Sequence, residues 1–471
     1  MPKTFSLSST IILRSEPQYY NTYAAFDYSR VRTELLAEDE YRILEHISSR
    51  PSEVREISRE LDVRSHRCER FLNRMARLGY VQVDAGSSAV KPHERIKADP
   101  ARYGQFALPF LSAPISVDVF VTSRCNLNCV HCFSSMDDQT VRELPVEDIR
   151  SILDQLEQLG VLEVRINGGE PLLHRQINEI LMTLETRRLR RVMLTNGTLL
   201  DEEKVRLLKE SDVVPTISID DSGAKAHDLF RGVNGSFQRT TEALKLLHKH
   251  GVEYGINCCV HKDNLRRHRQ IIDLAVKYGA CRIAFLDLKP SPRMKRNVAW
   301  VPSQSEYQEI LPELMLDRIR YAGKIDVALD TFLTCRPLEE AILEAKRGYV
   351  SCYAGRSRLS IDSSGSIYPC NLVISDPAWS MGNIGSERIS DIWFSKKWAF
   401  FRGGVKTSDL HECKDCKNLT KCRDFYCRVI PYLTDGDPFG PHPECLQVRT
   451  RSKSREQRRE QLQNHFPLPV D

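Results

Sequence analysis

The stretch ISVDVFVTSRCNLNCVHC, residues 115–132, joins an apolar segment to three closely spaced cysteines. Its first part predicts a buried β-strand, because β-branched and aromatic residues dominate a short run. The cysteines that follow, Cys125, Cys129 and Cys132, stand in a C-x3-C-x2-C spacing. Three thiolates on one loop can hold three irons of a cubane cluster and leave the fourth iron open for a substrate. Zinc is the alternative ligand of such a loop, and His131 could then complete the site.

A second motif follows one helical segment later, where the predicted strand 161–168 ends in Gly168, Gly169, Glu170 and Pro171. Two glycines let a backbone approach a ligand closely, and a carboxylate beside them suits an ammonium group. Taken alone, GGEP is an ordinary turn from a strand to a helix. Together the two motifs resemble those of the radical S-adenosylmethionine (SAM) enzymes. The resemblance implies that the methionine part of SAM chelates the open iron and that Glu170 holds its amine.

Strands and amphipathic helices alternate through the middle of the chain. Nearly continuous apolar strands separated by helices predict a parallel sheet of the α/β class. Six such units would form a partial (β/α)6 TIM-type barrel, in which ligands bind at the C-terminal ends of the strands. The six predicted strands are residues 115–122, 161–168, 190–197, 213–220, 252–260 and 281–288.

Polar residues close several of these strands and would therefore meet at one end of the barrel. The resemblance implies that Ser218, Asp220 and Arg231 contact the ribose hydroxyls and the methionine carboxylate of SAM. Asn196 and Asn257 are further candidates at the same strand ends. Capping and turn formation are the alternative explanation, because Ser, Asp and Asn are favoured there in any protein.

The last third of the chain carries a second group of cysteines that resembles the SPASM domain of peptide-modifying radical SAM enzymes. By this resemblance one auxiliary cluster is held by Cys413, Cys416, Cys422 and Cys445, and the other by Cys352, Cys370, Cys427 and, as a fourth ligand, Cys335. If Cys335 does not bind, one iron remains open for a substrate thiol. A zinc knuckle over residues 410–427 is the alternative. We interpret the other cysteines, Cys68, Cys258, Cys259 and Cys281, as core residues.

Residues 1–95 form a different unit, with three predicted helices followed by a strand. This order predicts a winged helix-turn-helix and resembles the recognition element of ribosomally synthesised and post-translationally modified peptides (RiPPs), which binds the leader of a precursor as an added strand. DNA binding is the alternative, since the third helix carries Arg64, Arg67, Arg70, Arg74 and Arg77. Residues 1–100 nevertheless hold 16 Lys and Arg against 15 Asp and Glu. Peptide binding is therefore favoured, and nucleic acid is not an expected partner.

The complete set of resemblances implies a peptide maturase with SAM and three 4Fe-4S clusters as cofactors. Reductive cleavage of SAM would yield a 5′-deoxyadenosyl radical, which abstracts hydrogen from a leader-bound precursor peptide. The expected product is an intramolecular crosslink, most readily a cysteine thioether, and the expected electron donor is a flavodoxin or ferredoxin. The alternatives are a carbon-carbon crosslink, a sulfatase-maturase-like oxidation, or a DNA-binding iron-sulfur redox regulator. The oxidation is disfavoured because that branch has an aspartate where this chain has Asn371.

Composition and length frame these expectations. The chain has 471 residues, a formal charge of +5 and 41% hydrophobic residues, which suits several soluble domains and gives no case for a membrane partner. Without an apolar run of about 18 residues or a signal-like start, a cytoplasmic location is expected, where clustered cysteines bind metals. The predicted divisions are a recognition unit 1–95, a linker 96–112, the barrel 113–302, a bridge 303–350, the SPASM domain 351–446 and a charged tail 447–471.

Overall fold

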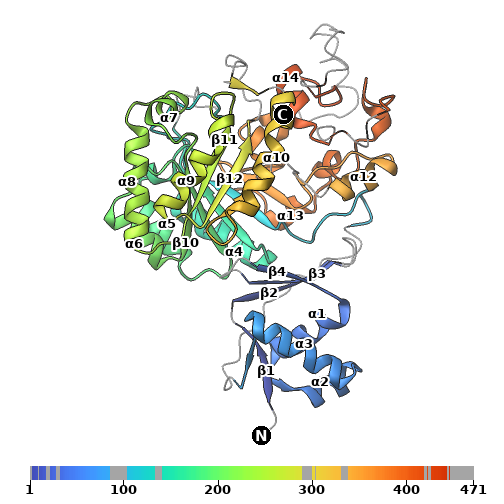
Figure 1. The fold of residues 1–471 in the computed structure, drawn as a ribbon. Helices are drawn as coiled ribbons and strands as arrows, with labels where there is room; N and C mark the ends of the chain where they lie inside the picture. The colour runs from blue at the N-terminus through green and yellow to red at the C-terminus, as the bar shows by residue number, and fades with distance from the viewer. Residues whose placement is uncertain are drawn as a thin grey trace.

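A computed structural model describes most of the chain as an α/β body with a smaller N-terminal unit at one end (Figure 1). Cys335 and the tail 447–471 lie outside the described residues. The described residues are 3–8, 10–16, 22–27, 32–84, 103–132, 141–288, 300–302, 304–329, 338–417, 419, 422, 426–442 and 445.

A ten-stranded sheet forms the centre of the body, in the order β13-β12-β11-β10-β9-β8-β7-β14-β15-β16. The strands from β7 to β13 are parallel and follow one another in chain order. This arrangement is that of a partial barrel, and it contains all six predicted strands. Their bounds are β7 Ser116–Phe120, β8 Glu163–Asn167, β9 Arg190–Thr195, β10 Val213–Ser218, β11 Gly255–Val260 and β12 Arg282–Asp287.

Helices connect the parallel strands, as expected for right-handed crossovers. Each has one apolar face: in α4, for example, Ile149, Ile152, Leu153 and Leu156 are buried at helical spacing against the sheet. The connecting helices are α4 Val146–Leu159, α5 Ile177–Leu184, α6 Glu202–Glu210, α7 Ala224–Arg231, α8 Ser236–Lys249, α9 His268–Tyr278 and α10 Gln304–Arg320.

The sheet continues beyond the predicted barrel region at both edges. Strand β13 comes from the predicted bridge and pairs in parallel with β12. At the other edge β14, from the predicted SPASM region, pairs in parallel with β7 and leads into an antiparallel hairpin. The bounds are β13 Asp326–Ala328, β14 Arg358–Ile361, β15 Ser366–Tyr368 and β16 Gly382–Asn383, with helices α12 Leu338–Lys346, α13 Ile389–Trp393 and α14 Val429–Asp435.

The N-terminal unit has two small sheets and the three predicted helices, which share one core. The sheet β5-β1-β6 places the strand that follows the third helix next to the first strand of the chain. The second sheet, β2-β3-β4, includes a strand at RTELL that the sequence did not predict. The bounds are β1 Thr4–Leu7, β2 Ile11–Glu16, β3 Thr22–Asp27, β4 Arg32–Leu36, α1 Glu38–Ser49, β5 Ser52–Glu53, α2 Val54–Leu61, α3 Ser65–Leu78 and β6 Val81–Val83.

Strand β2 attaches the N-terminal unit to the barrel, and Figure 1 shows this sheet nearest the larger body. Both carboxylate oxygens of Glu16 accept hydrogen bonds from Ser112, at 2.8 Å from its N–H and 2.6 Å from its hydroxyl. Arg14, which bonds to Glu16, also donates to the carbonyl of Ala113 at 2.8 Å. Strand β4 forms the opposite edge of this sheet, where Leu35 is 72% exposed.

The prediction that four further cysteines are core residues is correct for the buried Cys68 and Cys258. It is wrong for Cys281, which is exposed because it lies just before strand β12, outside the sheet; its thiol donates to the carbonyl of Tyr254. Cys259 is half-buried at a strand end. No helix within the described ranges is long and apolar enough to cross a bilayer.

Candidate active site

The cysteine loop follows β7 and is fixed on one side by the GGEP turn. The N–H of Gly169 donates to the carbonyl of Thr122 at 2.8 Å, and the N–H of Glu170 donates to the carbonyl of Arg124 at 2.7 Å. A Cβ on Gly169 would lie 2.3 Å from the carbonyl oxygen of Arg124. The sequence suggested that these glycines admit a ligand; in the structure the space beside them is filled by the backbone of the cysteine loop.

The end of helix α7 fixes the other side of the loop. Asn128 donates its N–H to the carbonyl of Arg231 at 3.1 Å, and Val130 donates to that of Phe230 at 2.9 Å. Gly232 ends the helix with φ 71°, and a Cβ there would lie 2.3 Å from the Asn128 carbonyl oxygen. The three cysteines are therefore carried by a loop that is clamped between two rigid elements, at the C-terminal end of the parallel sheet.

Glu170 turns its carboxylate into the protein beside this loop and is only 1% exposed. One oxygen accepts from the Thr195 hydroxyl at 2.6 Å and from the Leu172 N–H at 3.2 Å; the other accepts from the Asn196 N–H at 2.8 Å. Burial raises the pKa of the carboxyl to about 7 despite these bonds. A cationic ligand would favour the ionised form, so the group suits an ammonium.

Asp220 and Arg231 form a buried ion pair next to the second cysteine. Arg231 donates from Nε to Asp220 Oδ2 at 2.5 Å and from Nη1 to the Cys129 sulfur at 3.7 Å. Although burial favours the neutral acid, the Arg231 charge holds the pKa of Asp220 below its ordinary value. The second carboxylate oxygen accepts from the Cys259 N–H at 2.8 Å. Asp220 thus positions a cation beside a predicted cluster ligand.

Of the remaining predicted SAM residues, Asn196 and Ser218 lie at strand ends, whereas Asn257 lies within β11. Asn196 is buried and donates to the side-chain oxygen of Asn126, a residue of the cysteine loop, at 2.9 Å. Ser218 and Asn257 are register partners in β10 and β11, and both are half-buried. Sequence reasoning missed Asn126, although its position between Cys125 and Cys129 could have suggested a role in holding the loop.

A stack of rings covers one side of the cysteine loop. His131 lies parallel to Phe230 with centroids 4.5 Å apart, and Phe230 stacks on His261 at 4.1 Å. Burial lowers the pKa of His131 to about 3 and also lowers that of His261, so both imidazoles are neutral at pH 7. His131 Nδ1 and both ring nitrogens of His261 are buried without a hydrogen-bond partner among the described residues. Such atoms fit a bound polar group better than an empty site.

The predicted SPASM cysteines fall into two groups in space. Cys352, Cys370 and Cys427 pack against the main core, and Cys352 and Cys427 both lie within electrostatic reach of Cys370. Cys413 and Cys422 pack instead against a small separate core that includes Phe439, with Cys416 and Cys445 nearby. Burial raises the pKa of Cys413 to about 11, which bound iron would reverse. The assignment of ligands to two clusters stays a prediction.

Within the described residues, no three His, Cys, Asp or Glu side chains converge closely enough to share one metal ion. No disulfide joins the cysteines in the described part of the chain.

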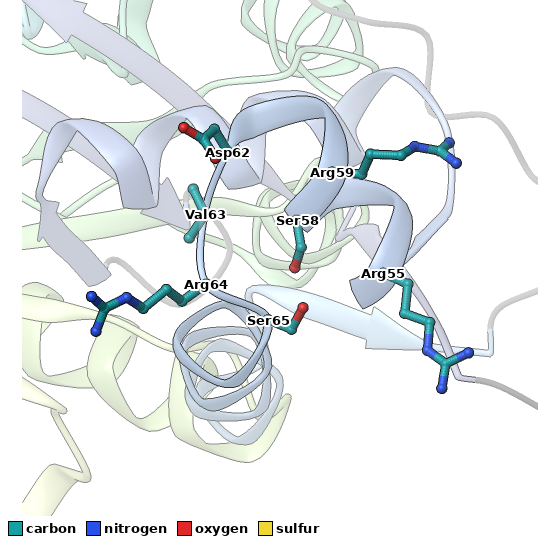
Figure 2. Close-up of a pocket in the computed structure, with 7 residues that line it drawn as sticks. All are labelled: Arg55, Ser58, Arg59, Asp62, Val63, Arg64 and Ser65. Atoms are coloured by element: carbon teal, nitrogen blue, oxygen red, sulfur yellow. The ribbon is translucent and has the colours of Figure 1, made fainter.

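The arginines of α3 are partly neutralised by neighbouring acids. Arg67 pairs with Asp39 of α1 at 2.6 Å, and Arg74 approaches Glu40 at 3.4 Å. At the turn between α2 and α3 an open hollow is lined by three further arginines, whose side chains point in different directions (Figure 2). These arginines are Arg55, Arg59 and Arg64. The helix therefore offers less free positive charge to DNA than its sequence suggested.

Two segments of the chain match known families. Residues 119–275 match the radical SAM superfamily, and residues 352–417 match the SPASM iron-sulfur cluster-binding domain. Among curated relatives, mycofactocin maturase MftC of Mycolicibacterium smegmatis is 30% identical over 342 residues, which span 72% of this chain and 84% of that protein. AdoMet-dependent heme synthase of Methanosarcina barkeri is 29% identical over 354 residues, or 71% of this chain and 97% of that protein.

A solved structure matches nearly the whole chain. SuiB of Streptococcus suis, bound to its precursor peptide SuiA, superposes with a TM-score of 0.69 over 94% of this chain and 100% of that one, at 17% identity. This likeness shows the overall fold. With the clamped three-cysteine loop, the match to MftC and both family matches, the chain belongs to the radical SAM superfamily and carries a SPASM iron-sulfur domain.

Proposed function

We propose that this protein is a RiPP maturase, a radical SAM enzyme that modifies a precursor peptide held at its leader by the N-terminal unit. The proposed modification is an intramolecular thioether, which joins a cysteine sulfur to a carbon with the loss of two hydrogens. The observation that carries the proposal is the N-terminal unit itself, docked on the barrel through Glu16 and Arg14. A barrel that acts on a tethered substrate gains effective concentration from such a unit.

The exposed edge of the N-terminal sheet supports leader binding by strand addition. The end of β2 faces residues 112–114 through the side chains of Arg14 and Glu16, whereas β4 presents the other edge of the sheet, with Leu35 exposed. An extended peptide can add to such an edge through main-chain hydrogen bonds. We propose that the three helices and β6 form the winged helix-turn-helix and that β4 receives the leader. Two similar proteins agree with this reading, since MftC is a maturase and SuiB was solved with a bound precursor peptide.

In the barrel, the residues already described would hold the cofactors. Cys125, Cys129 and Cys132 would bind the first 4Fe-4S cluster, and Glu170 would take the amine of SAM. When bound, these cofactors supply a 5′-deoxyadenosyl radical. The protein's part is to fix the cysteine loop through Gly169, to keep the Arg231 cation beside Cys129, and to exclude water with the ring stack.

The C-terminal cysteines would hold two auxiliary 4Fe-4S clusters, with Cys335 as the proposed fourth ligand of the second. They would accept the electron left on the substrate after bond formation, and a flavodoxin or ferredoxin would deliver electrons to the first cluster. Asn371 follows Cys370 and accepts a hydrogen bond from the Ser360 hydroxyl at 2.5 Å. An amide cannot take a proton at neutral pH, so the chemistry of an aspartate at this point is not proposed.

A haem-forming reaction is the second candidate, because a heme synthase matches nearly as well in sequence as MftC does. The two readings differ in what they require of residues 3–84. The peptide reading uses this unit to hold the leader, and it is supported by the high coverage of the match to SuiB. A haem-forming reaction involves no peptide that could add to the exposed edge of β4.

The test is an anaerobic assay of the reconstituted protein with dithionite and SAM. We expect 5′-deoxyadenosine and, when short peptides encoded next to this gene are added, a peptide product lighter by two hydrogens. The Cys125→Ser variant serves as the control and should form neither product. A protein that forms no 5′-deoxyadenosine would refute the proposal. So would a protein that leaves every such peptide unmodified while it produces haem.

A further inference from the structure

Arg428 is a buried cation in the SPASM region that forms no direct ion pair with a carboxylate of the described residues. It follows Cys427 directly and immediately precedes helix α14. Its side chain is enclosed, with the residue only 4% exposed. Nη1 donates to the carbonyl of Gly440 at 2.8 Å, but Nε and Nη2 have no hydrogen-bond partner among the described residues. Buried guanidinium nitrogens seldom lack hydrogen-bond partners.

The guanidinium lies between the two cysteine groups. Its backbone adjoins Cys427, which belongs with the group packed on the main core. Its side chain ends at Gly440, next to Phe439, and Phe439 packs with Cys413 and Cys422 of the other group. Burial lowers the pKa of Arg428, and the thiols of Cys413, Cys427 and Cys422 oppose that effect. Cysteines of both groups therefore lie within electrostatic reach of one cation.

Other buried arginines in the protein find partners of a different kind. Arg356 pairs with Glu344 at 3.0 Å, and Arg231 pairs with Asp220. Arg402 places its guanidinium 3.6 Å from the centroid of the Phe110 ring. Arg428 forms no direct ion pair and no ring contact with a described residue, although the buried Asp437 lies within electrostatic reach and adds to the effect of the thiols. A thiolate-ligated iron-sulfur cluster is anionic and would supply the missing charge and acceptors.

We propose that Arg428 is the shared counter-ion of both auxiliary clusters and raises their reduction potentials. This inference rests on the proposed binding of clusters by these cysteines. Arg428 touches no substrate in this role and acts as a positioning residue through charge. A nearby positive charge stabilises the reduced, more negative state of a cluster, so its removal lowers the potential.

The experiment compares Arg428→Gln, Arg428→Lys and Lys414→Gln, each reconstituted with iron and sulfide in a chain whose Cys125, Cys129 and Cys132 are replaced by alanine. In that chain the paramagnetic signals belong to auxiliary clusters alone. Lys414 is the matched control, because it adjoins Cys413 in sequence yet is exposed. Iron content and an EPR-monitored redox titration are the readouts, and neither needs enzyme activity.

Arg428→Gln should shift the potentials of both auxiliary clusters to more negative values, whereas Arg428→Lys and Lys414→Gln should leave them near those of the parent chain. If Arg428→Gln fails to hold iron, a Lys variant that holds it still supports the charge role. Unchanged potentials in Arg428→Gln, or equal loss in the Gln and Lys variants, would overturn the inference. A parent chain without auxiliary iron would overturn the cluster assignment as well.

Discussion

Glu170 combines full burial with a carboxyl pKa raised to about 7, and its ionisation should therefore control SAM binding. Below that pH the group is neutral and cannot pair with an ammonium, while above it the carboxylate can. SAM affinity of the reconstituted protein should rise from pH 6 to pH 8. Glu170→Gln should weaken binding by about 10- to 100-fold at pH 8, the usual value of a hydrogen bond to a charged group.

Equilibrium dialysis with labelled SAM measures this effect. The Gln variant is also the control for pH, since its weaker affinity should stay constant over the same range. A wild-type affinity that does not change with pH, or a variant that keeps the wild-type dependence, would contradict the role assigned to Glu170.

The close contact between Gly169 and the cysteine loop predicts that a larger residue at this position displaces the loop. Gly169→Ala brings a Cβ to 2.3 Å from the backbone carbonyl of Arg124, so the cysteine loop must move away from β8. We expect the variant to lose the first cluster, seen as a drop of about four irons per chain after reconstitution. Gly104→Ala is the matched control because nothing lies within 4 Å of the added Cβ. Equal iron in the two variants would show that the close contact is unimportant.

At the scale of elements, the contact between β2 and residues 112–114 should couple the N-terminal unit to catalysis. Glu16→Ala removes the acceptor of the largely buried Arg14 and of Ser112, at a cost of about 3 kcal/mol. We expect formation of the modified peptide to fall at least tenfold, while 5′-deoxyadenosine formed without peptide stays unchanged. Chromatography with mass detection measures both.

Glu38→Ala is the control for this experiment, because Glu38 is an exposed acid on α1 away from the contact. A parallel loss of both products in Glu16→Ala would indicate general unfolding, and normal peptide modification would show that docking through β2 is dispensable. Thermal unfolding of both variants separates these outcomes.

Element by element, the sequence predicts what depends on local pattern and misses what depends on distant pairing. The strands of the barrel are short, strongly apolar runs between helices, and all six were recognised. The place of β13 and β14 at the sheet edges was not, because pairing with β12 and β7 is decided by tertiary contacts. Strand β4 was missed since RTELL alternates too weakly to indicate a strand.

The same division applies to the candidate site. The spacing of Cys125, Cys129 and Cys132 predicted a cluster loop, and the resemblance to radical SAM enzymes indicated the acid of GGEP. The raised pKa of Glu170 and the two guanidinium nitrogens of Arg428 without a described hydrogen-bond partner could not be predicted, because both follow from burial in the folded chain. For Gly169 the sequence indicated a close backbone approach but not its partner, which is the cysteine loop.

For the whole molecule, the separation of the C-terminal cysteines into two groups predicts independent loss of iron. One group packs on the main core and the other on the small core around Phe439, so removing one set of ligands should leave the second environment intact. The wild-type protein should hold about twelve irons. Substituting both Cys352 and Cys370 with alanine should remove about four of them, and substituting both Cys413 and Cys416 should remove another four. Metal analysis by mass spectrometry counts iron and zinc in the same sample.

A wild-type protein that saturates near four irons, or that gains zinc in proportion as iron is lost, would instead favour a zinc site in the SPASM region. If either pair of substitutions removed all auxiliary iron, the two cores would not be independent, and a single shared centre would be the better description.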